Sequence, residues 1–228
     1  MSDGSEQSRR SESRKQSAPH TVLYTGRPLV SVIALRVQYS GSALDRLEPT
    51  EVQTGYELLW NAFLHFAKAR NALVLPPHGE EFVALFGIPE ELPDHAFRAL
   101  HTSMQLAAWL GEWRKRFVET GNEIPHFSLG LHSGETVAVR IPGAEDMEPP
   151  WAVAGETLRQ ATLVAALGKS GQVLVTEAFL HELSRAFPAG WESRQERIEE
   201  PAAAGELSWE LADFEPLPEH LERAAFSY

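Results

Sequence analysis

Residues 76–87 read PPHGEEFVALFG and directly follow the apolar run ALVL. The dipeptide His78-Gly79 supplies a residue that tolerates positive φ, which a tight turn between two strands requires. A β-hairpin is therefore predicted here, with Glu80 and Glu81 opening its second strand. Paired carboxylates at a hairpin tip can hold a divalent cation. They can equally be a solvated strand start that discourages edge-to-edge association.

One strand and two helices flank this hairpin in the sequence. The run LVSVIALRV at 29–37 is short, apolar and rich in β-branched residues, which predicts a strand buried on both faces. Helices are predicted from Pro49 onward and over 92–117, because apolar residues recur there at helical spacing. The first apolar stripe consists of Val52, Tyr56, Leu59, Phe63 and Phe66, and the second of Leu100, Met104, Ala107, Leu110, Trp113 and Phe117.

The second half of the chain continues with strands and helices. HFSLGLH (126–132) and ETVAVRI (135–141) predict a hairpin that turns around Ser133-Gly134. The remaining predicted elements are a strand, a glycine corner and a helix in 151–167, a strand over 172–176, a helix over 177–187, and weak edge strands over 191–199 and 206–214. This order predicts an α+β fold with a ferredoxin-like (βαββαβ-type) antiparallel sheet, helices packed on one face and C-terminal additions.

Composition places the chain among globular proteins. It has 228 residues, 43% of them hydrophobic, which is enough for the core of a single domain. The absence of cysteine excludes disulfides and thiolate metal sites and agrees with a reducing compartment. No apolar run is long enough to span a membrane and no signal peptide is evident, so a cytoplasmic location is expected.

Charge and composition divide the chain into three parts. The Ser/Arg-rich leader at 1–19 carries too few apolar residues to fold and is expected to be disordered. A domain over 20–216 and an acidic tail over 217–228 follow. The net charge of the chain is −12. Such an acidic body disfavours a nucleic-acid backbone or an anionic membrane as partner. The nine histidines are scattered without the spacing of a zinc site.

Five stretches in series resemble the catalytic domain of class III adenylate/guanylate cyclases. They are SVIALRV with RLEP, HGEEFVALFG, LPDHAFRAL, FSLGLHSGE and VAGETLRQATLVAALGKSGQVLVT, which together extend over about 28–183. The resemblance implies the ferredoxin-like fold with C-terminal additions. It also implies that two such domains pair head to tail, with composite sites at their interface.

The metal-binding positions of the family are altered in this chain. Cyclases of this class use two metal ions, which the family holds with one aspartate at the end of the first strand and another at the hairpin tip. These positions correspond to Arg36 and Glu80. Glutamate can ligate a metal, but arginine cannot, and its fixed positive charge stands where a dication would bind.

The other half of the composite site is altered as well. The adenine-selecting lysine corresponds to Pro76 and its base-reading partner to Ala152. The ribose-orienting asparagine corresponds to Arg159, and the arginine that stabilises the transition state corresponds to Leu163. A shift of one residue would offer Gln160 for the asparagine, but still no arginine.

These substitutions predict a catalytically inactive cyclase-like domain that acts as a dimerisation or regulatory module in signalling. No catalytic residue, metal or cofactor is expected, and the partner is a second copy, an active cyclase or another signalling protein. Two alternatives stay open. One is a metal-independent nucleotide sensor in which Arg36, Glu80 and Arg159 form a ligand site, the two arginines binding phosphate. The other is an active cyclase that uses Glu80 and a further acid.

Overall fold

The computed structural model describes residues 25–41, 45–119, 125–141, 150–186, 195–198 and 208–211. The predicted leader and acidic tail lie outside these residues, and so do the predicted ends of the domain. Phe117, the last member of the second apolar stripe, lies outside the described side chains.

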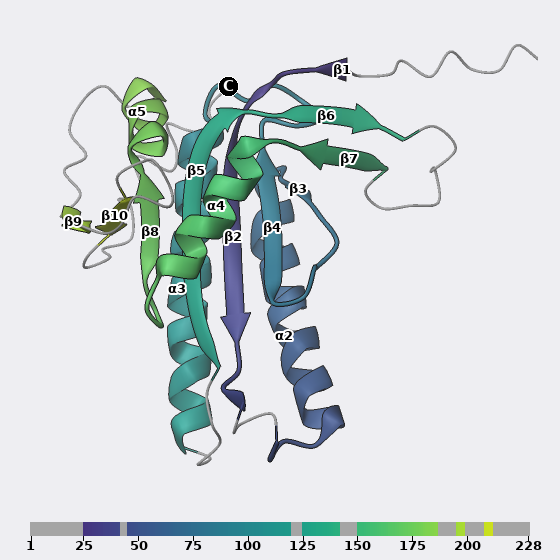
Figure 1. Ribbon diagram of the computed structural model, residues 1–228, viewed down its shortest axis with the longest axis vertical. Helices are drawn as coiled ribbons and strands as arrows, with labels where there is room; N and C mark the ends of the chain where they lie inside the picture. The colour runs from purple at the N-terminus through teal and green to yellow at the C-terminus, as the bar shows by residue number, and fades with distance from the viewer. Residues whose placement is uncertain are drawn as a thin grey trace, which may run out of the picture.

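A seven-stranded sheet forms the centre of the molecule, with strand order β3-β4-β2-β5-β8-β10-β9 (Figure 1). All neighbouring strands are antiparallel except β5 and β8, which are parallel. The strands are β2 (Leu29–Gln38), β3 (Leu73–Val74), β4 (Glu81–Phe86), β5 (His126–Glu135), β8 (Val173–Thr176), β9 (Gln195–Ile198) and β10 (Ser208–Leu211). The helices are α2 (Pro49–Lys68), α3 (His95–Glu119), α4 (Glu156–Leu167) and α5 (Glu177–Ala186).

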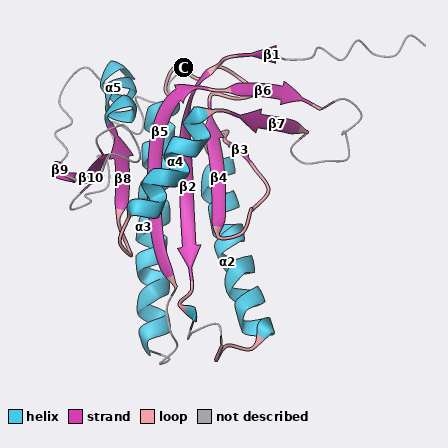
Figure 2. Ribbon diagram, viewed as in Figure 1, coloured by secondary structure: helices cyan, strands magenta, loops and turns pink. Residues whose placement is uncertain are grey.

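The predicted fold class is confirmed. The segment β2-α2-β3-β4-α3-β5 has the β-α-β-β-α-β order of a ferredoxin-like unit, and its strands lie side by side as β3-β4-β2-β5 (Figure 2). The predicted hairpin between β3 and β4 is present, and Gly79 at its turn has a φ of +58°. The C-terminal addition extends this unit beyond β5 with β8, β10 and β9.

Strand β2 is buried on both faces, as predicted, because each face of the sheet packs against helices. Its residues Ile33, Leu35 and Val37 join the core formed with α2, α3 and α5. Its residues Val32 and Ala34 point to the other face, where α4 crosses the sheet (Figure 1). Three helices thus lie on one face as expected, whereas α4 lies on the opposite face, which the sequence pattern did not indicate.

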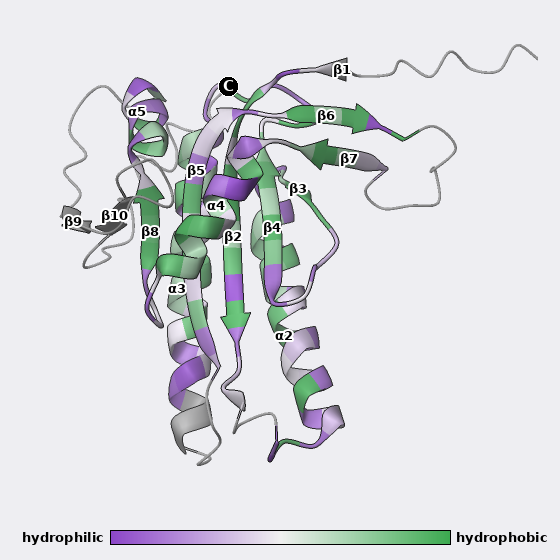
Figure 3. Cartoon of the chain, viewed as in Figure 1, coloured by the Kyte–Doolittle hydropathy of each residue, from purple (hydrophilic) through white to green (hydrophobic). Residues whose placement is uncertain are grey.

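The larger core is aromatic and lies beneath α2. Phe82 of β4 is in ring contact with Tyr56, Trp60 and Phe63, at centroid distances between 5.7 and 6.1 Å. Leu59 and Phe63 of the predicted stripe are fully buried. Colouring by hydropathy shows the apolar residues of the central strands continuing into the faces of the helices (Figure 3).

The predicted hairpin around Ser133-Gly134 is wrong. Strand β5 continues to Glu135, because both residues are satisfied within the sheet: they pair in register with Ser31 and Val30 of β2. The hydroxyl of Ser133 is also hydrogen-bonded to that of Ser31 at 2.6 Å.

The actual hairpin follows later in the chain and belongs to a separate three-stranded sheet. Strands β6 (Val137–Arg140) and β7 (Trp151–Ala154) pair with one another, and β6 also pairs with β1 (Thr25–Gly26). This small sheet extends away from the end of the large one (Figure 1). Ala138 of β6 and Trp151 and Val153 of β7 belong to the same apolar cluster as Leu158, which is near the start of α4.

The two weak strands near the C-terminus exist in part. Strand β9 is the edge of the sheet as predicted, but β10 pairs with both β8 and β9 and is an interior strand. The other residues of the predicted ranges lie outside the described ones. None of the helices in the described part of the chain is long and apolar enough to cross a membrane.

Candidate functional site

Arg36 and Glu80, predicted from positions far apart in the sequence, lie next to each other. Arg36 is near the end of β2 on the face covered by α4, and Glu80 is at the tip of the β3–β4 hairpin. Nη2 of Arg36 is 3.6 Å from Oε2 of Glu80, and the two side chains are 29% and 40% exposed. The backbone holds the tip in place, since the amide of Val37 donates to the carbonyl of Glu80 at 2.8 Å.

This ion pair leaves part of the guanidinium unsatisfied. Nε of Arg36 is buried and has no hydrogen-bond partner among the described residues. Ser128, the register partner of Arg36 on β5, does not provide one, because its hydroxyl donates to the carbonyl of Ala165 at 2.6 Å. Arg36 therefore contacts Glu80 through one nitrogen, without the bidentate geometry that makes such pairs strong.

Glu80 also interacts electrostatically with a phenol of α2. Burial, and secondly the negative charge of Glu80, raise the pKa of Tyr56. Tyr56 in turn stacks on Tyr39, whose pKa is raised by burial and by Tyr56. The negative charge of Glu80 thus acts both on the guanidinium of Arg36 and on the phenol of Tyr56.

The residues at this site do not fit a divalent cation. Such an ion needs about six oxygen ligands, several of them carboxylates. The side chains here are Glu80 and the neighbouring Glu81, with the guanidinium of Arg36 beside them. Over the described ranges, no group of three or more His, Cys, Asp or Glu residues is placed to hold a metal.

Arg159, the third predicted residue, is on the exposed side of α4. Its Nε donates to Oε2 of Glu156 at 2.7 Å, and its Nη2 makes a further contact with the same carboxylate. These hydrogen bonds lower the pKa of Glu156 and raise that of Arg159. Gln160, the residue offered by the alternative alignment, is buried and donates to Glu156 at 2.6 Å, so it does not face solvent.

Arg159 does not meet Arg36 within one chain. Helix α4 runs along β5 so that Thr157 lies beside Gly134 and Ala165 lies beside Ser128. Arg36 is paired with Ser128, so Arg159, near the start of α4, is on the order of 15 Å from it along the sheet. The structure therefore brings together Arg36 and Glu80, but it leaves Arg159 apart.

The positions matched to the base-reading and transition-state groups carry no suitable side chain. Pro76 is exposed before the hairpin turn, Ala152 is exposed on β7, and Leu163 is partly buried on α4. None of these three side chains has a hydrogen-bonding or charged group.

The sequence pattern did not reveal two buried polar clusters. In one, the hydroxyl of Ser31 is hydrogen-bonded to Nδ1 of His95 at 2.8 Å and to Ser133. In the other, Nδ1 of His132 is hydrogen-bonded to the hydroxyl of Thr176 at 2.9 Å. Burial lowers the pKa of His95, and it lowers that of His132 to about 4. In the sequence, these clusters were indicated only by a polar residue inside an otherwise apolar run, such as Ser31.

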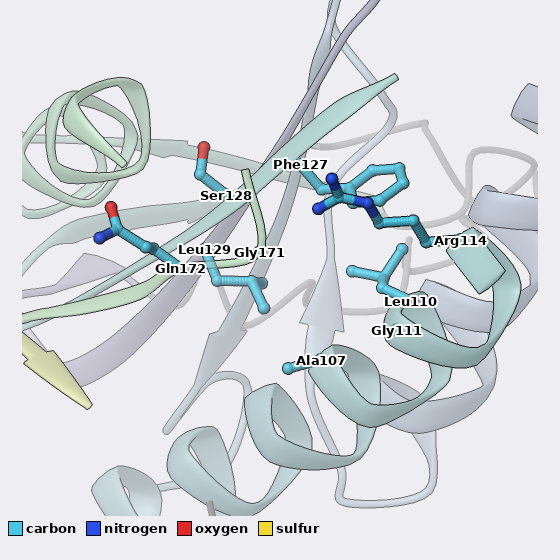
Figure 4. A pocket seen from close by; sticks show the side chains of 9 residues that line it. All are labelled: Ala107, Leu110, Gly111, Arg114, Phe127, Ser128, Leu129, Gly171 and Gln172. Atoms are coloured by element: carbon cyan, nitrogen blue, oxygen red, sulfur yellow. The ribbon is translucent and has the colours of Figure 1, made fainter. Parts of the chain in front are cut away.

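A small pocket lies on the other face of the sheet from Arg36. It has a volume of about 120 Å³ and lies between α3, β5 and the turn before β8 (Figure 4). Arg36, Glu80 and Arg159 do not line it. Its volume is well below the roughly 300 Å³ at which pockets for drug-sized ligands begin, so it does not fit a nucleotide.

Comparison with known proteins identifies the fold. No protein-family model and no curated protein matches the sequence. Among solved structures, the adenylyl cyclase CyaB from P. aeruginosa superimposes with a TM-score of 0.70 at 13% identity, over 84% of this chain and 97% of that one. The guanylyl cyclase Cya2 superimposes with a TM-score of 0.69 at 16% identity, over 85% of this chain and 96% of that one.

A fungal guanylyl cyclase is also similar. The non-canonical dimeric guanylyl cyclase domain of the RhoGC fusion protein from Blastocladiella emersonii matches with a TM-score of 0.61 at 18% identity, over 81% of this chain and 94% of that one. A further crystal structure of a guanylyl cyclase domain from this fusion protein is monomeric. The fold of the chain is that of class III cyclase catalytic domains.

Proposed function

We propose that this chain is a cyclase-homology domain without catalytic activity, which acts in signalling as a dimerisation or regulatory module. The observation that carries the proposal is the ion pair between Arg36 and Glu80. It occupies the end of β2 and the hairpin tip, where the resemblance to class III cyclases places two metal-binding carboxylates.

A guanidinium at this place works against the chemistry of a cyclase. Attack of a ribose 3′-hydroxyl on the α-phosphate relies on metal ions, which lower the pKa of the hydroxyl and neutralise the phosphate charge. Arg36 repels a dication, and it has no lone pair with which to bind one. The apolar side chains of Pro76, Ala152 and Leu163 also supply no group for base recognition or transition-state stabilisation.

Pairing does not depend on the metals, and the small sheet offers a surface for it. Val137, Val139, Ala152 and Ala154 share one face of β6 and β7, by register and alternation. Val137 is 43% exposed, and Ala152 and Ala154 are exposed as well. The other face of the same strands packs on the core through Ala138. An apolar outer face on a projecting sheet favours association with a second copy or with another cyclase-like domain.

The nucleotide-sensor alternative has less support. Arg36 is partly exposed and its Nε has no hydrogen-bond partner in the described part of the chain, which favours an anion. However, a phosphate would have to compete with Glu80 for Arg36 and with Glu156 for Arg159. Each carboxylate offsets the positive charge that the sensor would need.

The proposal is tested by incubating the purified chain with ATP or GTP in Mg²⁺ or Mn²⁺ and measuring cyclic nucleotides by mass spectrometry. CyaB from P. aeruginosa serves as the positive control. We expect no product, no heat of nucleotide binding and a dimeric mass by light scattering. A Mn²⁺-dependent product that is lost in Glu80→Ala, but kept in the exposed control Glu91→Ala, would overturn the proposal in favour of an active cyclase.

Nucleotide binding without turnover would favour the sensor. In that case Arg36→Glu combined with Arg159→Asn should abolish binding. Affinity that is unchanged in this double variant would exclude these two arginines as the ligand site.

A further inference from the structure

The pocket between α3 and β5 has an apolar floor and one charged residue. Ala107 and Leu110 of α3 and Phe127 and Leu129 of β5 line it, and Arg114 is the charged member of its lining. In Figure 4 these side chains lie around a common space, whereas the polar ends of Ser128 and Gln172 point away from it. The polar ends of both are engaged elsewhere: Ser128 bonds to Ala165, and Gln172 accepts from the amide of Lys169 at 2.6 Å.

Arg114 has an uncommitted positive charge among the side chains that the structure describes. Nη1 of Arg114 makes a long hydrogen bond, 3.5 Å, to the hydroxyl of Ser170. The carboxylate nearest in sequence, Glu112, is instead paired with Lys115 at 2.6 Å. None of the described residues that line the pocket is acidic, so its lining carries one positive charge and no negative one, although the chain as a whole is acidic.

We propose that this pocket binds a small carboxylic acid with an apolar body, the carboxylate on Arg114 and the body between Leu110 and Phe127. A volume of about 120 Å³ is close to that of apolar cavities that hold one benzene ring, roughly 150 Å³. The complementary ligand has a body of about six carbons and one negative charge, as in benzoate or hexanoate. A guanidinium fork matches a carboxylate in shape as well as in charge.

The position of this pocket connects it to the rest of the molecule. Phe127 and Leu129 flank Ser128, which is the register partner of Arg36 on the opposite face of the sheet. Gly171, another lining residue, is in the turn that joins α4 to β8, and its amide donates to the carbonyl of Phe127 at 2.7 Å. A bound acid would thus contact α3, β5 and the α4–β8 turn at once and hold them together.

The test titrates the full chain with sodium benzoate and hexanoate and follows the amide resonances of Gly111 and Gly171 by NMR. Benzyl alcohol and hexanol serve as neutral ligands of similar shape, and acetate serves as a carboxylate that lacks the larger apolar group. We expect saturable binding of the two acids in the millimolar range or tighter, with the alcohols about tenfold weaker and acetate silent.

Two pairs of variants locate the site. Gly111→Leu fills the pocket, since a Cβ at Gly111 meets no atom within 4 Å, and should abolish binding; Ala108→Leu, exposed on the same helix and outside the lining, should not. Arg114→Gln should remove the preference for acids over alcohols, whereas Lys115→Gln should retain it. Equal binding of acids and alcohols to the unaltered chain, full binding in Gly111→Leu, or no binding at about 10 mM ligand would each overturn the proposal.

Discussion

At the scale of single residues, Arg36 decides what the end of β2 can do. The ion pair with Glu80 is partly exposed and loosely aligned, at 3.6 Å. Pairs of this kind contribute between 0 and about 1 kcal/mol to stability. Arg36 therefore matters mainly for the charge that it places beside the hairpin tip, which excludes a dication.

Replacing Arg36 by aspartate should create a weak metal site. The variant Arg36→Asp with Glu80→Asp places two carboxylates at the end of β2 and the hairpin tip, and removes the repelling charge. We expect its affinity for Mn²⁺ to exceed that of the unaltered chain by at least about tenfold, measured by electron paramagnetic resonance of free Mn²⁺. Arg36→Asn with Glu80→Asp is the control that removes the cation without adding a carboxylate. Equal affinity in both double variants would contradict the assignment of this place as a former metal site.

Two buried histidines make stability depend on pH. The pKa of His132 is lowered to about 4 and that of His95 is lowered as well, both chiefly by burial. The folded state therefore holds these rings neutral, while the unfolded chain protonates them near pH 6.5. Above pH 6.5 these rings do not reduce the free energy of unfolding. As the pH drops toward 4, the free energy of unfolding falls, by up to about 3 kcal/mol for His132.

The pH dependence is measured by urea unfolding between pH 7.5 and pH 4.5. His132→Gln should reduce the slope of unfolding free energy against pH, and His126→Gln, at an exposed position on the same strand, should leave it unchanged. A slope that does not change in His132→Gln would show that this ring is not kept neutral by the fold.

At the scale of elements, α4 lies on the sheet because β5 carries a glycine beneath it. A Cβ at Gly130 would be 2.3 Å from the carbonyl oxygen of Ala161 and from the amide nitrogen of Ala165. Both atoms belong to the backbone of α4, so no side chain can move aside to make room. The small residues Ala161 and Ala165 complete this close approach of helix and strand.

Gly130→Ala should destabilise the protein by about 3 kcal/mol, because the added methyl group forces the helix away from the sheet. Gly111→Ala is the matched control: it lies in the interior of α3 with open space around its Cβ, and should stabilise the protein by about 0.5–1 kcal/mol. Chemical denaturation compares the two variants with the unaltered chain. A cost below about 1 kcal/mol for Gly130→Ala would mean that the helix accommodates the methyl group.

At the scale of the whole molecule, the fold provides surfaces for partners. The larger core beneath α2 and α3 is complete within one chain, and the small sheet projects from it with an apolar outer face. The structurally similar fungal domain has been crystallised both as a non-canonical dimer and as a monomer, so one domain of this fold is seen in both states.

If the outer face of β6 and β7 mediates pairing, Val137→Asp should raise the dimer dissociation constant by at least about tenfold. Leu58→Asp provides a matched control, since Leu58 is an apolar side chain of similar exposure, 47% against 43%, on the distant helix α2. Analytical ultracentrifugation measures both variants. If Val137→Asp and Leu58→Asp weaken the dimer equally, or if Val137→Asp does not weaken it, the interface lies elsewhere.

Most of the elements and the candidate site near the hairpin could be predicted from the sequence alone. Apolar periodicity identified α2 and α3, a continuous apolar run identified β2, and the His78-Gly79 dipeptide identified the hairpin, because each of these patterns reflects local geometry. Arg36 and Glu80 could be assigned to the same site because each lies at a fixed position in a motif that resembles the cyclase family. Whether catalysis has been lost stays a prediction.

How these elements lie against one another depends on contacts between residues that are distant in the sequence. The Ser133-Gly134 dipeptide has the composition of a turn, but it continues a strand, because pairing with β2 satisfies it. The close packing of α4 on the sheet requires a glycine 26 residues before that helix. The pocket at Arg114 arises where α3, β5 and a later turn meet. Each of these is set by contacts between distant segments, which local periodicity does not encode.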